Sequence, residues 1–181
     1  MTGAGTADGR YYTCQGLECM RNFEGNDIIF GDRTLSGFGA DEYLLRDFIS
    51  EAVDKNRFYW HQTWGIITNV NKMLNFLSDD VVGNTAKLKE YKARGLIVRA
   101  YAYAYLMENY QDSYLLGGKD KLGIMLYDSY SPIQELKPRS SAVETYNFIK
   151  KDLNDAITLF QAAEKGYTKT TLTDIDMAVA K

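Results

Sequence analysis

The chain has 181 residues, of which 45% are hydrophobic and 25% are charged. This balance is typical of one globular domain with a real core, and it excludes a disordered tail. The formal net charge is −3 and no cluster of lysine and arginine stands out, which argues against nucleic acid, whose phosphates need a basic surface. No run of about 18 apolar residues occurs, so the sequence predicts no membrane-spanning helix.

The first predicted segment, residues 1–56, is expected to be mostly irregular, because Gly, Thr and Asp are frequent early in it and its apolar stretches are short. From Arg57 the pattern changes to a spacing of three or four residues, as one face of an α-helix requires. The side chains on this face are Trp60, Trp64, Ile67, Asn71, Leu74 and Leu77. The sequence therefore predicts a helix over 57–77, followed by a stop at 78–80.

A second helix is predicted over 85–109 from the same kind of spacing. Its inward-facing positions are Leu88, Tyr91, Leu96, Ala100, Tyr103 and Met107. The short link to the preceding helix predicts an antiparallel helical hairpin. Gly95 lies inside this helix and costs about 1 kcal/mol relative to alanine, for which a close crossing with a neighbouring helix would compensate.

Residues 111–138 form a long connection, and connections of this length are uncommon in compact domains and often functional. Ser140 or Ser141 then caps a third helix, with Glu144 spaced to complete a capping box with Ser141. The predicted apolar face of this helix consists of Val143, Tyr146, Ile149, Leu153, Ala156 and Phe160.

A fourth helix is predicted to begin at Thr173 or Asp174 and to continue to the last residue. The chain would then stop inside a helix, so we expect a fragment truncated at its C-terminus. The elements together predict an all-α fold of tetratricopeptide-like helical hairpins, with an irregular N-terminal segment and the long 111–138 connection. We divide the chain into the segment 1–56 and a helical scaffold, 57–181.

No motif in the sequence assembles an active site. The glycine-rich start, GAGTADG, lacks the preceding strand and the following Lys-Ser/Thr that a phosphate loop needs. His61 has no motif supplying a nucleophile or an orienting acid, so we interpret it as structural or surface-lying. Asp152 and Asp155 are interpreted as a solvated helix face rather than as paired catalytic carboxylates. With one histidine, a zinc site at Cys14 and Cys19 is not predicted, and whether these cysteines pair is left open. The sequence thus predicts no enzyme, no cofactor and no metal.

Three stretches resemble the SusD/RagB family of bacterial outer-membrane nutrient-binding lipoproteins. Residues 60–71 are similar to the family's W-x3-Y-x2-I-x3-N helix, with a tryptophan in the tyrosine place. Residues 92–101 are similar to its E-A-x-F-L-R-A-Y helix, with lysine and glycine in the glutamate and phenylalanine places. Residues 139–159 resemble the helix that follows in the family, and this third match is the most specific. The resemblance covers about residues 57–181.

The resemblance implies non-enzymatic binding of nutrients, most often oligosaccharides, at the surface of the bacterial outer membrane. It implies a helical scaffold that packs against a TonB-dependent (SusC-like) transporter, to which the nutrient is delivered. Family members carry a leader and a lipidated cysteine, and this chain shows neither. The first residues have no basic-then-apolar run, which fits either a cytoplasmic protein or one whose leader has been removed.

In the family the ligand site draws on irregular segments before the tryptophan-bearing helix and on the later half of the protein. The candidates that this implies here are Asp32, Arg33, Phe38, Tyr43 and Tyr59. Aromatic faces stack on sugar rings, while carboxylate and guanidinium groups hydrogen-bond to hydroxyls. For each residue an ordinary surface or core role is the commoner alternative. A tetratricopeptide-type protein interaction module and, more weakly, a small helical hydrolase stay open as other functions, and the sequence does not identify the ligand.

Overall fold

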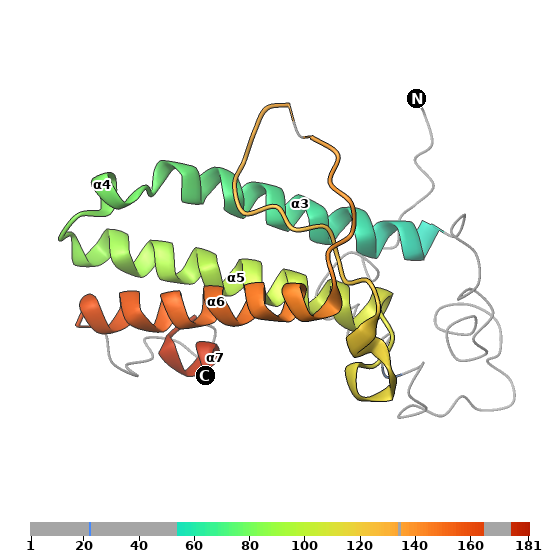
Figure 1. Ribbon diagram of the computed structural model, residues 1–181. Coiled ribbons are helices and arrows are strands. Elements are labelled where there is room, and N and C mark those ends of the chain that lie inside the picture. The colour runs from blue at the N-terminus through green and yellow to red at the C-terminus, as the bar shows by residue number, and fades with distance from the viewer. Residues whose placement is uncertain (1–21, 23–53, 134, 165–174) are drawn as a thin grey trace, which may run out of the picture. The chain divides into compact units, whose positions relative to one another are not determined.

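The structure is a computed structural model that describes residues 22, 54–133, 135–164 and 175–181. The chain divides into two compact units between Tyr59 and Trp60, and the second unit carries most of the described elements (Figure 1). We call this second unit, Trp60–Lys181, the helical unit. Regular structure in the described ranges is helical, with a single isolated bridge in place of strands. The predicted all-α class is therefore confirmed.

Helix α3, Asp54–Phe76, begins slightly before the predicted boundary of 57 and ends close to the predicted 77. Its predicted inward face is confirmed, because Ile67 and Asn71 are buried and the remaining predicted positions are half-buried. The predicted end of this helix is confirmed, since α3 stops at Phe76, but the short helix α4, Asp79–Val82, which follows it was not predicted. Acidic residues in the first turn favour a helix N-terminus, and this preference outweighs their preference for turns.

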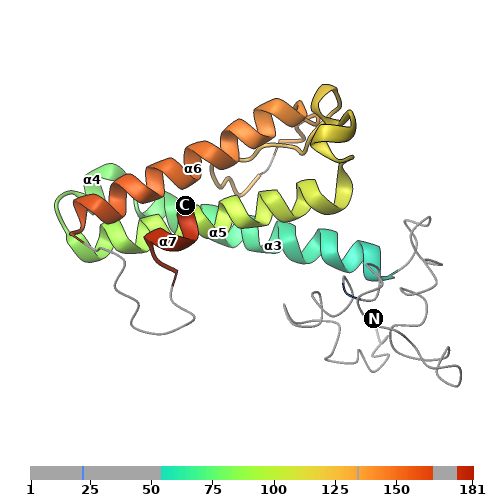
Figure 2. The same ribbon diagram turned by 90° about the horizontal axis from the view of Figure 1, so that it is seen from below.

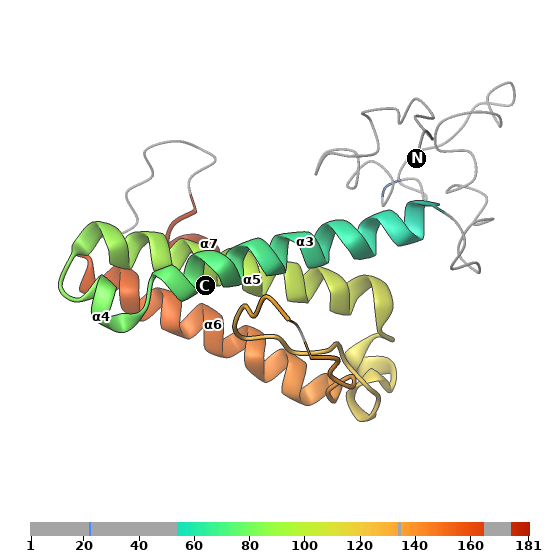
Figure 3. The ribbon, with the colours of Figure 1, turned by 90° about the horizontal axis from the view of Figure 1, so that it is seen from above.

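Helix α5, Ala86–Tyr110, runs antiparallel to α3 as the short link predicts (Figures 1 and 3). The ring contacts show the direction, because Trp60 near the start of α3 meets Tyr110 at the end of α5, while Trp64 meets Tyr103. Near the other end of the hairpin, Gly95 lies directly against α3.

The absence of a side chain at Gly95 is what lets the two helices approach here. A Cβ atom at this position would overlap Met73 Cε and lie 3.3 Å from Leu74 Cδ2. The close crossing expected at this glycine is therefore present, and packing against α3 offsets the lower helix propensity of glycine.

Helix α6, Ala142–Ala162, begins with the predicted capping box. Ser141 Oγ accepts a hydrogen bond from the Glu144 amide at 3.1 Å, and Glu144 Oε2 accepts one from the Ser141 amide at 2.8 Å. These reciprocal bonds satisfy two of the donors that every helix start leaves unpaired. The helix runs antiparallel to α5 and packs along it (Figure 2).

Two buried clusters follow α5 from end to end. One gathers side chains of α3, α5, α6 and the connection around Tyr103, including Ile67, Leu106, Ile124 and Ile149. The other joins α5 and α6 to the C-terminal residues, through Ala93, Leu96, Ile97, Ala156, Phe160 and Met177. Two predicted inward positions are wrong: Tyr91 is exposed beneath the Lys87 ammonium, and Val143 is exposed in the first turn of α6. Both lie at the border of the apolar stripe, where spacing alone does not decide burial.

The connection between α5 and α6 has local structure of its own. It contains two short 3₁₀ helices, η1 (Tyr114–Leu116) and η2 (Gly118–Asp120), and then an antiparallel bridge between Leu122 and Ser141. Gly123 is required beside this bridge, because a Cβ there would overlap Thr145 Oγ1 and lie 2.8 Å from the Ser141 carbonyl oxygen. The bridge closes the connection into a loop that rises over α3 (Figure 1).

The last described element is a short helix, α7, Met177–Ala180. Asp176 caps it by accepting a hydrogen bond from the Ala178 amide at 2.9 Å. The predicted start at 173 or 174 is wrong, because residues 175 and 176 are not helical and Asp176, in extended conformation, is the N-cap of α7. Helix α7 packs on α6, and Arg94 of α5 donates a hydrogen bond to the Ile175 carbonyl at 3.2 Å.

Candidate functional site

Four of the five residues proposed for ligand binding, Asp32, Arg33, Phe38 and Tyr43, lie outside the described residues. Tyr59 is described, lies in α3 and is half-buried. These five assignments therefore stay predictions. The polar and aromatic groups that the structure does bring together come from α3, α5, α6 and the connection.

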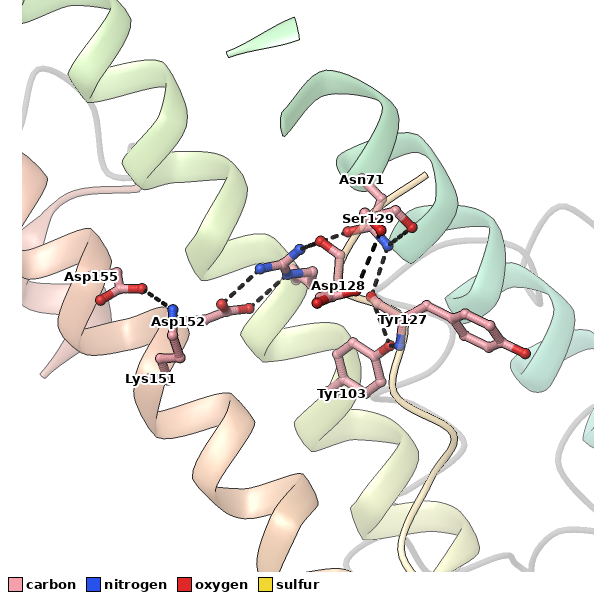
Figure 4. A network of polar contacts seen from close by, with 9 residues as sticks. Asn71, Tyr103, Tyr127, Asp128, Ser129, Lys151, Asp152 and Asp155 are labelled. Carbon is pink, nitrogen blue, oxygen red and sulfur yellow. Dashed lines mark hydrogen bonds and ion pairs between the residues drawn. The ribbon is translucent and has the colours of Figure 1, made fainter. Parts of the chain in front are cut away.

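Arg99 stands at the centre of a buried polar network, whose other members are labelled in Figure 4. Its guanidinium donates two parallel hydrogen bonds to Asp152, from Nε to Oδ2 at 2.7 Å and from Nη2 to Oδ1 at 2.8 Å. The two side chains are only 7% and 1% exposed. The interpretation of Asp152 as part of a solvated face is therefore wrong, while Asp155, one turn away, does lie at the surface and pairs with Lys151. Helical spacing does not reveal a charge partner that is far away in the sequence.

Asn71 and the connection complete the coordination of Arg99. Nη1 of the arginine donates to Asn71 Oδ1 at 2.8 Å and to the Asp128 carbonyl at 2.7 Å. The Asn71 amide in turn donates to the Tyr127 carbonyl at 2.9 Å. One guanidinium thus joins α3, α5 and α6 to the connection, and its buried charge is matched by one carboxylate and two oxygen acceptors.

Tyr103 fixes the same segment of the connection. Its hydroxyl accepts a hydrogen bond from the Tyr127 amide at 2.8 Å and donates to the Tyr127 carbonyl at 3.2 Å. Burial raises the pKa of the Tyr103 hydroxyl. Burial also raises the pKa of Asp152, against the opposing effect of Arg99. The Tyr103 hydroxyl and the Asp152 carboxylate hold the connection and Arg99 in place, because their hydrogen bonds go to these groups within the protein.

Next to this network lies a groove between α3 and residues 127–132, which we call the α3 groove. Its volume is about 340 Å³. Its walls carry the rings of Trp64, Tyr127 and Tyr130, the amide of Asn71, the ammonium of Lys72 and the hydroxyls of Thr68, Ser129 and Ser131.

Two asparagines of α3, one turn apart, hold the far wall of the α3 groove. Asn71 binds the Tyr127 carbonyl, and Asn75 donates to the Tyr130 carbonyl at 2.9 Å. The Tyr130 amide donates back to Asn75 Oδ1 at 3.4 Å. Because these bonds go to the backbone, they fix the segment without using the rings of Tyr127 and Tyr130.

The rings of Trp64 and Tyr127 meet edge to face, with their centroids 5.7 Å apart. The Lys72 ammonium stands 4.8 Å from the centroid of the Tyr130 ring. In Figure 4 the Tyr127 ring points away from the arginine network. The Trp64 Nε1 donor is buried without a hydrogen-bond partner in the described structure, which is unusual for a protein interior.

The groups that line the α3 groove are of kinds that can hold a ligand. In the described ranges, no group of three or more His, Cys, Asp or Glu side chains is placed to hold a metal ion. His61 is exposed on α3. No described helix is long and apolar enough to cross a membrane. The α3 groove offers aromatic faces, hydroxyls and one ammonium.

A larger hollow, of about 770 Å³, lies near the end of α5 and the bridge. Its polar side chains are mostly engaged within the protein. Lys121 pairs with Asp112, Gln111 donates to the Gly118 carbonyl at 3.0 Å, and Arg139 donates to the Gly123 carbonyl at 2.6 Å. These bonds build the turn of the connection, so this hollow is the weaker candidate for a site.

Comparison with known families resolves the class of the protein. A family model described as SusD-like, starch-binding and associating with the outer membrane, matches residues 28–175. The chain belongs to this SusD-like family. The resemblance seen in the sequence is thereby confirmed.

A solved structure agrees with the fold of this SusD-like chain. It is the 1.90 Å crystal structure of a protein from Bacteroides vulgatus ATCC 8482 that is provisionally described as sugar binding. The two share 21% identity with a TM-score of 0.60, over 70% of this chain. The chain spans 28% of the length of that protein. No curated protein matches the chain.

The sequence of this SusD-like chain did not indicate the α3 groove. Tyr127 and Tyr130 lie in the connection, where no periodicity marks a side chain as facing a site. The one available signal was the length of the 111–138 connection, since long ordered connections often carry function. Asn71 was placed on the inward face of its helix, but its spacing did not say that it binds the connection.

Proposed function

We propose that this protein binds oligosaccharides at the bacterial cell surface without chemically altering them and delivers them to a TonB-dependent outer-membrane transporter. The observation that carries the binding part is the α3 groove, a surface lined by aromatic rings and hydroxyls in a member of a family described as starch-binding. A position at the outer membrane, with a lipid anchor, is part of the same proposal.

The chemistry of the α3 groove supports a sugar ligand. A pyranose ring has an apolar face that packs on aromatic rings, and hydroxyls at its edge that need polar partners. Tyr130 and Tyr127 supply rings, while Thr68 and Ser131 supply hydroxyls at the groove walls. The residues Asp32, Arg33, Phe38, Tyr43 and Tyr59 are proposed to contribute a further part of the ligand surface.

A panel of oligosaccharides titrated into the purified protein by isothermal titration calorimetry tests the binding part. We expect saturable binding that weakens in Tyr130→Ala, and in Tyr43→Ala or Arg33→Ala if the earlier segment contributes. Chromatography of the sugar afterwards should show an unchanged chain length. Cleaved products would contradict the non-enzymatic proposal. Absence of binding across the panel, together with capture of a protein partner, would favour a tetratricopeptide-type interaction module instead.

Exposed leucines of the connection support the transporter part of the proposal. Leu115 and Leu116 of η1 are 91% and 85% exposed, so their side chains are available to a protein partner. Co-purification of the transporter from outer membranes should fall in Leu115→Glu with Leu116→Glu. Leu136→Glu, equally exposed elsewhere on the connection, is the control. Unchanged co-purification in the double variant would place the contact elsewhere, and no transporter in either preparation would refute delivery.

A further inference from the structure

The α3 groove carries a single charge. Among the residues that line the groove, Lys72 is the one with a charged side chain, and no aspartate or glutamate lines it. This differs from the chain as a whole, whose net charge is −3. A single cation in an otherwise neutral, aromatic groove favours a ligand that carries a negative charge.

The Lys72 ammonium is held at the groove, but none of the described residues neutralises its charge. It stands over the Tyr130 ring at 4.8 Å, and no carboxylate of the described residues lies within ion-pair distance of it. The cation–π contact fixes its place without supplying a counter-charge. A second ammonium, that of Lys137, stands 5.3 Å from the Tyr127 ring and donates to the Leu126 carbonyl.

The acidic residue nearest in sequence to the groove wall is directed elsewhere. Asp128 lies between Tyr127 and Ser129, but it lines a separate hollow together with Arg99, Lys151 and Asp155. Its carbonyl accepts from Arg99, and its carboxylate accepts a long hydrogen bond from Ser129 Oγ at 3.4 Å. The positive charge of Lys72 is therefore left facing the α3 groove.

We propose that the α3 groove is a subsite for an acidic sugar, a pyranose bearing a carboxylate as in a uronic acid. The sugar ring packs against Tyr130 and Tyr127, and its carboxylate pairs with the Lys72 ammonium. This inference rests on the proposed function, since it assigns a charge class to a glycan that the protein binds. It adds a ligand site in the connection to the residues proposed before α3.

Calorimetric titration with oligosaccharides of galacturonic acid and of glucuronic acid tests the inference. The matched ligand in each case is the same oligosaccharide with its carboxyl groups reduced to alcohols, which removes the charge and keeps the ring. We expect the acidic form to bind about fivefold more tightly, as one partly exposed ion pair allows. Raising the salt concentration from about 0.05 M to about 0.5 M should reduce this preference, because exposed charges are screened.

Variants locate the effect. Lys72→Gln should remove the preference for the acidic form, while Lys150→Gln, which removes an exposed charge from α6 away from the groove, should leave it unchanged. Tyr130→Ala should weaken both forms. Equal affinity of the two forms, or a preference that survives Lys72→Gln, would overturn the inference. Binding of neutral oligosaccharides alone would overturn it and leave the proposed function standing, whereas failure of every oligosaccharide would overturn both.

Discussion

Replacement of Asp152 by asparagine tests whether the arginine network holds the three long helices together. The substitution keeps the size of the side chain and one acceptor oxygen, but it removes the negative charge and one of the two hydrogen bonds from Arg99. The guanidinium then keeps Asn71 Oδ1 and the Asp128 carbonyl as partners. It has no charge partner left in the described structure.

The expected loss follows from the burial of the pair. Arg99 and Asp152 are 7% and 1% exposed, so water cannot replace the missing carboxylate. Removing one partner of such a pair costs about 3–5 kcal/mol, because an uncompensated charge stays buried. The free energy of unfolding of an ordinary domain is about 5–15 kcal/mol, so this loss is a large fraction of the total stability. We expect about 3 kcal/mol, since the asparagine retains one acceptor.

Urea denaturation followed by far-ultraviolet circular dichroism measures this loss. The matched control is Asp155→Asn on the same helix, whose pair with Lys151 is largely exposed and should contribute less than about 1 kcal/mol. Combining Arg99→Met with Asp152→Asn should cost less than the sum of the two single substitutions, because the stranded charge is gone. Equal destabilisation by Asp152→Asn and Asp155→Asn would refute the reasoning.

Two further predictions concern glycines in α3 and the connection and the N-cap of α6. Gly123→Ala should destabilise the protein by about 1–3 kcal/mol, since its Cβ would overlap Thr145 Oγ1. Gly65→Ala on α3 should stabilise the protein by about 1 kcal/mol, because the added Cβ would meet nothing within 4 Å and alanine has the higher helix propensity. Thermal melting of the two variants checks that the two changes in stability have opposite signs. Ser141→Ala should cost about 1 kcal/mol in urea denaturation. The Ser141 amide and hydroxyl, which both donate hydrogen bonds to the Glu144 carboxylate, hold its pKa below the usual value, so the stability that these bonds supply is present at neutral pH and is lost as the pH falls through the lowered pKa of the folded state. Glu144→Gln should remove this part of the pH dependence, and an unchanged pH dependence in that variant would contradict the reasoning.

The sequence predicted the helices well because each helix is decided by neighbours in the chain. The three-four spacing placed α3, α5 and α6 within a few residues of their bounds, and the capping box located the start of α6 at Ser141. Burial at the border of a stripe was less predictable, as Tyr91 and Val143 show. The course of the connection was not predictable, since it depends on side chains of α3 and α5 that lie far from it in the sequence.

The network gives a physical reason for the three stretches that resemble the SusD family. Each stretch contributes one polar residue, Asn71 from α3, Arg99 from α5 and Asp152 from α6, and these three meet at a single guanidinium (Figure 4). Asn71 binds Arg99 through its oxygen and the Tyr127 carbonyl through its nitrogen, so the residue that joins the helices also sets one wall of the α3 groove. Substitutions in the network should therefore weaken ligand binding in proportion to their effect on the position of residues 127–130. The helical scaffold and the proposed ligand surface are therefore coupled, and Asn71 is the side chain at which they meet.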